Sequence, residues 1–102
     1  MQQITSSQIR EKITNKESFV LDMFATWCGP CKTLMTNLEK AQEHNLSLPV
    51  YKFDIDSDRE FVGEMGVRSV PTLKVFKSGE IAATKVGVVP VNDLVQLINS
   101  NG

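Results

Sequence analysis

Both cysteines of the chain lie within one five-residue segment, Trp27-Cys28-Gly29-Pro30-Cys31, which also holds the only tryptophan among 102 residues. On a helix, side chains three positions apart share a face, with Cβ atoms about 5–6 Å apart. A disulfide bond needs Cα atoms about 4.4–6.8 Å apart. A Cys-x-x-Cys pair at the start of a helix can therefore form and break a disulfide with little backbone movement. The spacing predicts thiol–disulfide exchange.

The flanking segments place this pair between a strand and a helix. Residues 19–25 are nearly all apolar, as in a strand covered on both faces, and residues 32–44 carry apolar side chains at helical spacing. At such a junction the first cysteine faces unpaired backbone N–H groups and the positive end of the helix dipole, which stabilise the reactive thiolate. Pro30 suits the first helical turn, where its missing N–H costs nothing.

Two structural roles compete with the redox interpretation. As a covalent staple, the pair closes so short a loop that chain entropy supplies only about 2 kcal/mol. As half of a zinc site, it lacks partners, because structural zinc takes four ligands and the chain adds one histidine, His44, with no second ligand at suitable spacing. The sequence therefore predicts neither a metal site nor a bound cofactor.

Length and composition indicate one globular domain spanning residues 1–102. The chain is 41% hydrophobic and 23% charged, and its net charge of −1 comes from 11 basic and 12 acidic residues without a long single-sign block. This balance favours neither nucleic acid nor a membrane as a partner. Residues 1–12 are polar and lack the apolar core of a signal peptide, so the expected location is the cytoplasm. There a lone Cys-x-x-Cys pair is catalytic more often than structural.

The order of the expected elements predicts an α/β fold. They are a short strand at 2–4, a helix through about 15, strands at 19–25 and 50–55, a helix at 32–44, a short helix ended by Gly66, a hairpin of strands 72–77 and 80–86 turning at Ser78-Gly79, and a last helix opened by Pro90. Parallel crossovers followed by a hairpin predict a central mixed sheet of four to five strands flanked by helices on both faces. The cysteine pair then lies at the carboxyl end of a central strand, where sites in α/β sheets occur.

These segments resemble the thioredoxin family over nearly the whole chain. The matching segments are Val20-Leu21-Asp22, 25–32, Asp54-Ile55-Asp56, 67–72, 76–79 and Lys85-Val86-Gly87. The resemblance implies the thioredoxin fold and reduction of disulfides in oxidised protein substrates by dithiol–disulfide exchange. It also implies recycling by an NADPH-dependent thioredoxin reductase, and we expect the chain to act as a monomer.

The resemblance further implies Cys28 as the attacking thiol and Cys31 as the resolving thiol. Exposure at the helix tip suits the first role, whereas Cys31, inside the first turn, needs a group that accepts its proton. Asp22, the only charge within residues 19–25, is the candidate, because burial raises a carboxyl pKa toward neutrality. Lys52 in the next strand would oppose that rise. The alternatives are a solvated carboxylate at Asp22 and a surface lysine with a covered stem at Lys52.

A flat apolar docking surface beside the cysteines is also implied by the resemblance. Its residues are Trp27, Gly29, Pro30, Val70, Pro71 and Gly87. A cis peptide before Pro71 is part of the implication, although an ordinary strand-start proline is favoured by the sequence alone. A cis bend would expose the backbone of Val70, to which an extended substrate could pair like an added strand. The chain departs from many family members at Met23-Phe24, where Phe-Trp is usual, so a second tryptophan is missing.

Two other functions compete with disulfide reduction. An oxidase or isomerase more often carries a histidine between its cysteines than the Gly29-Pro30 found here. A docking subunit without redox chemistry would not need both cysteines together with Asp22 and Lys52. Disulfide reduction is therefore the interpretation that accounts for these residues together.

Overall fold

A five-stranded sheet forms the centre of the computed structural model, which describes all 102 residues. In chain order the elements are β1 (Gln2–Gln3), α1 (Ser6–Thr14), β2 (Phe19–Phe24), α2 (Gly29–Ala41), β3 (Val50–Asp54), the 3-10 helix η1 (Ile55–Ser57), α3 (Arg59–Glu64), β4 (Thr72–Lys77), β5 (Glu80–Val86) and α4 (Val91–Asn101). The strands lie in the order β1-β3-β2-β4-β5. As expected, the first strand is short.

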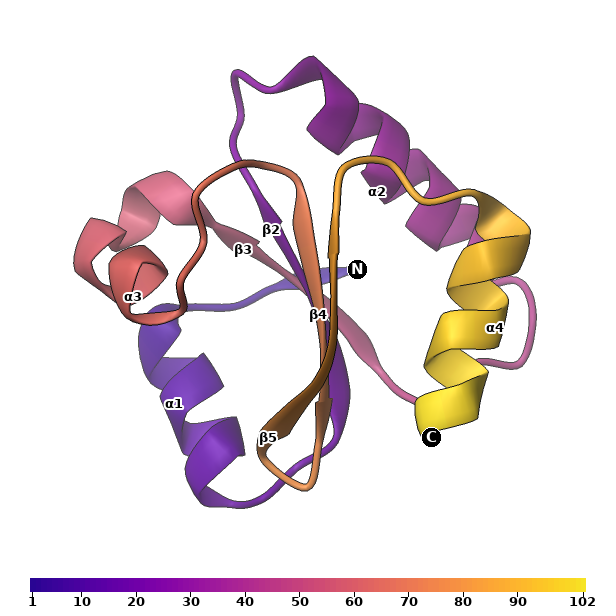
Figure 1. Cartoon of the computed structure of the whole chain (residues 1–102), viewed down its shortest axis with the longest axis horizontal. Coiled ribbons are helices and arrows are strands. Elements are labelled where there is room, and N and C mark those ends of the chain that lie inside the picture. The colour runs from indigo at the N-terminus through magenta and orange to yellow at the C-terminus, as the bar shows by residue number, and fades with distance from the viewer.

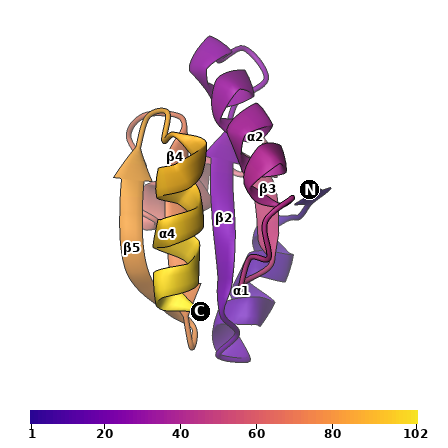
Figure 2. The same ribbon diagram turned by 90° about the vertical axis from the view of Figure 1, so that its right-hand side faces the viewer.

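The sheet is mixed, and helices cover both of its faces. The strands β1, β3 and β2 run parallel, whereas β4 is antiparallel to both β2 and β5. Helices α1 and α3 lie on one side of the sheet and α2 and α4 on the other (Figure 1). Turning the molecule shows α2 and α4 crossing in front of the strands (Figure 2). The predicted fold class is confirmed.

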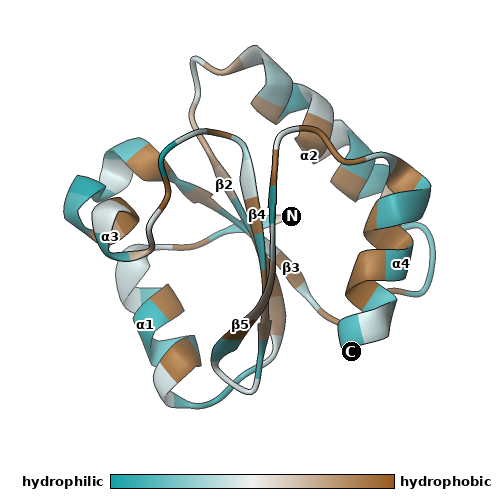
Figure 3. Cartoon of the chain, in the orientation of Figure 1, coloured by the Kyte–Doolittle hydropathy of each residue, from teal (hydrophilic) through white to brown (hydrophobic).

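Strand β2 holds the middle of the sheet, with β3 on one side and β4 on the other. All six of its residues are buried. Alternate side chains enter two separate apolar cores: Phe19 and Leu21 pack on the α1 and α3 side, and Val20 packs with the leucines of α2 and α4. The apolar stripes of the helices face the sheet in the same way (Figure 3). A strand anchored on both faces and both edges gives the segment that follows it a fixed starting point.

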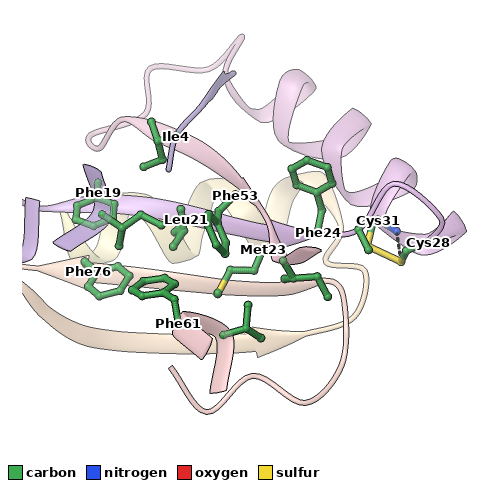
Figure 4. Close-up of a cluster of buried hydrophobic side chains, with 14 residues drawn as sticks. Ile4, Phe19, Leu21, Met23, Phe24, Cys28, Cys31, Phe53, Phe61 and Phe76 are labelled. Atoms are coloured by element: carbon green, nitrogen blue, oxygen red, sulfur yellow. Dashed lines mark hydrogen bonds between the residues drawn. A yellow bond between two sulfur atoms is a disulfide. The ribbon is translucent and has the colours of Figure 1, made fainter. Parts of the chain in front are cut away.

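Aromatic side chains fill the core on the α1 and α3 side. Phe19 stacks on Phe76 with ring centroids 4.6 Å apart, and Phe53 meets Phe61 edge to face at 5.4 Å. This row of side chains runs along β2 and reaches the two cysteines at one end (Figure 4). The packing therefore supports the end of the strand from which the cysteine segment begins.

Residues at the turns explain where the hairpin strands end and where α2 begins. The hairpin turns at Ser78 and Gly79, with φ of 53° and 81°, and a Cβ on Gly79 would lie 2.6 Å from the carbonyl oxygen of Ile13. Strands β4 and β5 have the predicted ends. Helix α2 begins and ends three residues before the periodic segment 32–44. Gly29 and Pro30 form its first turn, as expected for Pro30, and its last residue is Ala41.

Candidate functional site

The cysteine pair lies where β2 passes into α2. Cys28 is the N-cap residue of α2, with extended backbone angles, and Cys31 lies in the first turn. A disulfide joins them, with Cα atoms 5.3 Å apart (Figure 4). The backbone N–H of Cys31 donates a hydrogen bond to Cys28 Sγ at 3.2 Å. The predicted geometry of a closing pair is confirmed, and the donated N–H would stabilise a thiolate on Cys28.

The two sulfurs differ in their access to solvent. Cys31 is completely buried, whereas Cys28 keeps 6% of its surface exposed. The order is the one expected, but Cys28 is more covered than its place at a helix tip suggested. Cys28 is covered by a segment distant in sequence: the carbonyl oxygen of Val70, just before β4, lies 3.7 Å from Cys28 Sγ. A reagent can therefore approach the pair only at Cys28, beside Val70.

Limited alkylation of the reduced protein should label Cys28 in preference to Cys31. The reason is that only Cys28 has exposed surface and a hydrogen bond that favours its thiolate. We expect a labelling ratio of about ten or more with limiting iodoacetamide near pH 7, mapped by peptide mass spectrometry. Urea-unfolded protein, in which both thiols are solvated, is the control and should lose the preference. A label found mainly on Cys31 of the folded protein would overturn this order of access.

Asp22 is a buried carboxyl in the middle of β2. It has no exposed surface, and neither carboxyl oxygen has a hydrogen-bond partner. Its side chain alternates with Leu21 and Met23 and so lies on the α2 face, the side of Val20. Burial raises the pKa of the Asp22 carboxyl to about 7, and the charge of Lys52 partly lowers it. The alternative of a solvated carboxylate is wrong.

Lys52 lies opposite Asp22 in the register of β2 and β3. The side chain is half-buried, and its ammonium nitrogen lies 5.7 Å from the centre of the Phe24 ring. No ion pair joins Lys52 to Asp22, so its positive charge acts on the carboxyl through space. The structure thus brings together the two charged residues that the sequence singled out.

The expected docking surface is assembled from three loops. The peptide bond between Val70 and Pro71 is cis, as the resemblance implied. The N–H of Gly87, at a φ of 90°, donates to the carbonyl oxygen of Pro71 at 2.9 Å. Trp27, Gly29 and Pro30 are exposed, whereas Pro71 is buried. Pro71 therefore shapes the backbone of this surface and offers no side chain to a partner.

Three polar residues beside Trp27 were assigned no role from the sequence. The indole N–H of Trp27 donates to Asp56 Oδ2 at 3.0 Å, and the other oxygen of Asp56 pairs with Arg59. Arg68 lines the same cavity as Trp27 and Arg59. Asp56 and Arg68 lie inside segments that match the family, but no spacing rule links them to a tryptophan about 30 or 40 positions away.

Comparison with known proteins identifies the family. The family model described as Thioredoxin matches residues 1–100. This chain belongs to the thioredoxin family. Thioredoxin from Bacillus subtilis is 40% identical over 89 residues, covering 86% of each chain. Thioredoxin from Porphyra purpurea is 36% identical over 99 residues, covering 95% of this chain and 92% of its relative.

Solved thioredoxin structures share the fold. Chloroplastic thioredoxin z superposes with a TM-score of 0.85 at 25% identity, covering 98% of this chain and 92% of the other. A mutant thioredoxin from Halobacterium salinarum gives 0.84 at 29% identity, covering 98% and 90%. Together with the disulfide-bonded pair, the family match indicates protein disulfide oxidoreductase activity. None of the helices has the length and apolar character needed to span a bilayer.

Proposed function

We propose that this protein is a protein disulfide reductase in which Cys28 attacks and Cys31 resolves. The observation that carries the proposal is the joined pair at the start of α2, where only Cys28 is open to a partner. In the first step the Cys28 thiolate attacks one sulfur of a substrate disulfide, forms a mixed disulfide and releases one substrate thiolate. In the second step the Cys31 thiolate attacks Cys28 Sγ, which re-forms the Cys28–Cys31 disulfide and releases the second substrate thiolate. Two electrons pass to the substrate.

Asp22 takes the proton of Cys31 in the second step. A buried thiol is reluctant to ionise, because burial disfavours its charged form. A general base works best when its pKa lies near the working pH, and burial raises the pKa of Asp22 to about 7. Asp22 is buried on the α2 face of the sheet and Cys31 is buried in the first turn of α2, and we propose that the proton passes between them directly or through one water. Lys52 limits the rise of that pKa and so helps to keep Asp22 able to lose its proton again.

The oxidised protein needs a source of electrons before it can act again. Members of the thioredoxin family generally act on disulfide substrates and are reduced by thioredoxin reductase. We therefore assign an NADPH-dependent thioredoxin reductase as the recycling partner, oxidised proteins as substrates, a monomer as the working form and the cytoplasm as the location. A compartment that keeps thiols reduced suits a pair that works by donating electrons.

Reduction of insulin tests the proposal directly. With thioredoxin reductase and NADPH present, catalytic amounts of the protein should consume NADPH and precipitate the insulin B chain. Omitting the reductase should limit the reaction to one insulin disulfide for each protein molecule reduced beforehand. A variant carrying both Cys28→Ser and Cys31→Ser is the control and should be inactive. Failure of the pre-reduced protein to reduce insulin would reject the function, whereas failure only in the coupled assay would reject the assigned reductase.

A further inference from the structure

A cavity of about 420 Å³ lies beside Trp27. Its walls are mainly apolar and come from Trp27, η1, α3 and the segment that leads to β4. The larger hollow of about 780 Å³, between β5 and α4, is lined by neither cysteine nor by Trp27. The cavity at Trp27 is therefore the one placed to receive a substrate segment next to its disulfide.

Two arginines, Arg59 and Arg68, form a basic rim on this cavity, and only Arg68 has no ion-pair partner. Arg59 is paired with Asp56, and the indole N–H of Trp27 is taken up by the same carboxylate. Arg68 is exposed and forms neither a hydrogen bond nor an ion pair within the chain. Arg59 thus uses one of its donors on Asp56, while the guanidinium of Arg68 keeps all its donors for a partner.

Arg68 lies close in sequence to Val70, the residue whose backbone covers the reacting sulfur of Cys28. Val70, whose carbonyl oxygen lies 3.7 Å from Cys28 Sγ, also lines the cavity. Arg68 precedes Val70 by two residues, and because the chain bends at Ser69 and Val70 the two lie no more than about 7 Å apart. A substrate segment that lies along Val70 while its sulfur is attacked can therefore bring a side chain two or three residues from the attacked cysteine to Arg68.

We propose that this cavity selects protein substrates that carry an aspartate or glutamate two or three residues from the attacked cysteine. The apolar wall takes the stem of that side chain, and its carboxylate pairs with Arg68. A guanidinium matches a carboxylate through two parallel hydrogen bonds, which adds orientation to charge attraction. This selectivity rests on the proposed function, because it concerns the substrate of that same disulfide.

The expected effect appears in substrate binding. An ion pair at an exposed site contributes about 0.2–1 kcal/mol, so a glutamate should raise kcat/KM by about 1.4-fold to fivefold over a glutamine. The pair exists before and during thiol attack alike, so it should lower KM and leave kcat nearly unchanged. Raising the salt concentration should reduce the difference, because the pair is exposed to solvent.

Oxidised peptides that differ at one position provide the test. Each peptide holds one internal disulfide, with glutamate, glutamine or lysine placed two or three residues from the attacked cysteine. The wild-type protein should reduce them in the order glutamate, glutamine, lysine. Arg68→Gln should make the rates equal, and Arg68→Glu should reverse the order. Lys77→Gln, which removes the same charge at the other end of β4, is the matched control and should behave as the wild type.

The outcomes separate the selectivity from the underlying function. If no peptide is reduced, the proposed disulfide reductase function itself is rejected. If all peptides are reduced at equal rates by both the wild type and Arg68→Glu, the reductase function stands and the acidic selectivity is overturned. Equal rates for the three peptides with Lys77→Gln, as expected for Arg68→Gln, would also overturn it, because net charge and not the cavity would then set the preference.

Discussion

Replacing Cys31 with serine should stop turnover and leave a stable mixed disulfide between Cys28 and the substrate. A serine hydroxyl at this position cannot attack the mixed disulfide, while the exposed edge of Cys28 still performs the first step. We expect catalytic reduction to fall by about three orders of magnitude or more, the scale seen when a nucleophile is removed. Incubation of Cys31→Ser with a disulfide substrate, followed by acid quench and intact-mass measurement, should show one covalent adduct per molecule.

The matched variant Cys28→Ser gives the control for this trap. Its remaining thiol is completely buried, so it should form no adduct under the same conditions and should also be inactive. Peptide mapping of the Cys31→Ser adduct should place the substrate on Cys28. An adduct on Cys31 in the Cys28→Ser variant, formed at a similar rate, would mean that the assigned order of attack is wrong.

Replacing Asp22 with asparagine should stabilise the oxidised protein above neutral pH. The carboxyl pKa is about 7 in the folded chain against 3.8 for an ordinary aspartate, so the folded state binds more protons than the unfolded state between those values. Wild-type stability should therefore fall as the pH rises from about 4 to about 7 and level off above that. At pH 8 the buried carboxylate is charged and unpaired, and Asp22→Asn should gain about 2–4 kcal/mol in urea unfolding.

The same variant should slow the second chemical step more than the first. The amide of Asp22→Asn cannot accept the proton of Cys31, so resolution should slow by about a hundredfold, while attack by Cys28 stays nearly intact. Rapid acid quench should then reveal accumulated mixed disulfide. Asp93→Asn, which alters an exposed carboxylate in α4, is the control for both measurements. Unchanged resolution together with an unchanged pH profile of stability would mean that Asp22 neither carries the raised pKa nor moves this proton.

The elements that the sequence predicted well are those whose signals are local. The Ser78-Gly79 turn sets the hairpin, because its two positive φ angles suit a two-residue connection. The nearly continuous apolar run of β2, with Asp22 as its one charge, predicted both a central strand and a buried carboxyl. These inferences need only the residue types within a few positions of each other.

Features that depend on distant segments could not be predicted in the same way. The covering of Cys28 comes from Val70, 42 positions later, and the contact of Trp27 with Asp56 spans 29 positions. The apolar periodicity marked α2 only from residue 32, whereas the spacing of the cysteines and the place of Pro30 indicated the earlier start that the structure shows, with Cys28 as the cap. The basic rim of the cavity arises only when Arg59 and Arg68 are brought to Trp27 by the fold.

The place of Trp27 makes the protein an optical reporter of its own oxidation state. It is the only tryptophan in the chain, adjacent to Cys28, 67% exposed and held by Asp56. All indole emission therefore originates at the rim of the disulfide, with no second fluorophore of this kind in the core at Met23-Phe24. Because no other tryptophan contributes, a change around this indole when the Cys28–Cys31 bond opens can be followed in the emission of the unlabelled protein, without added dye.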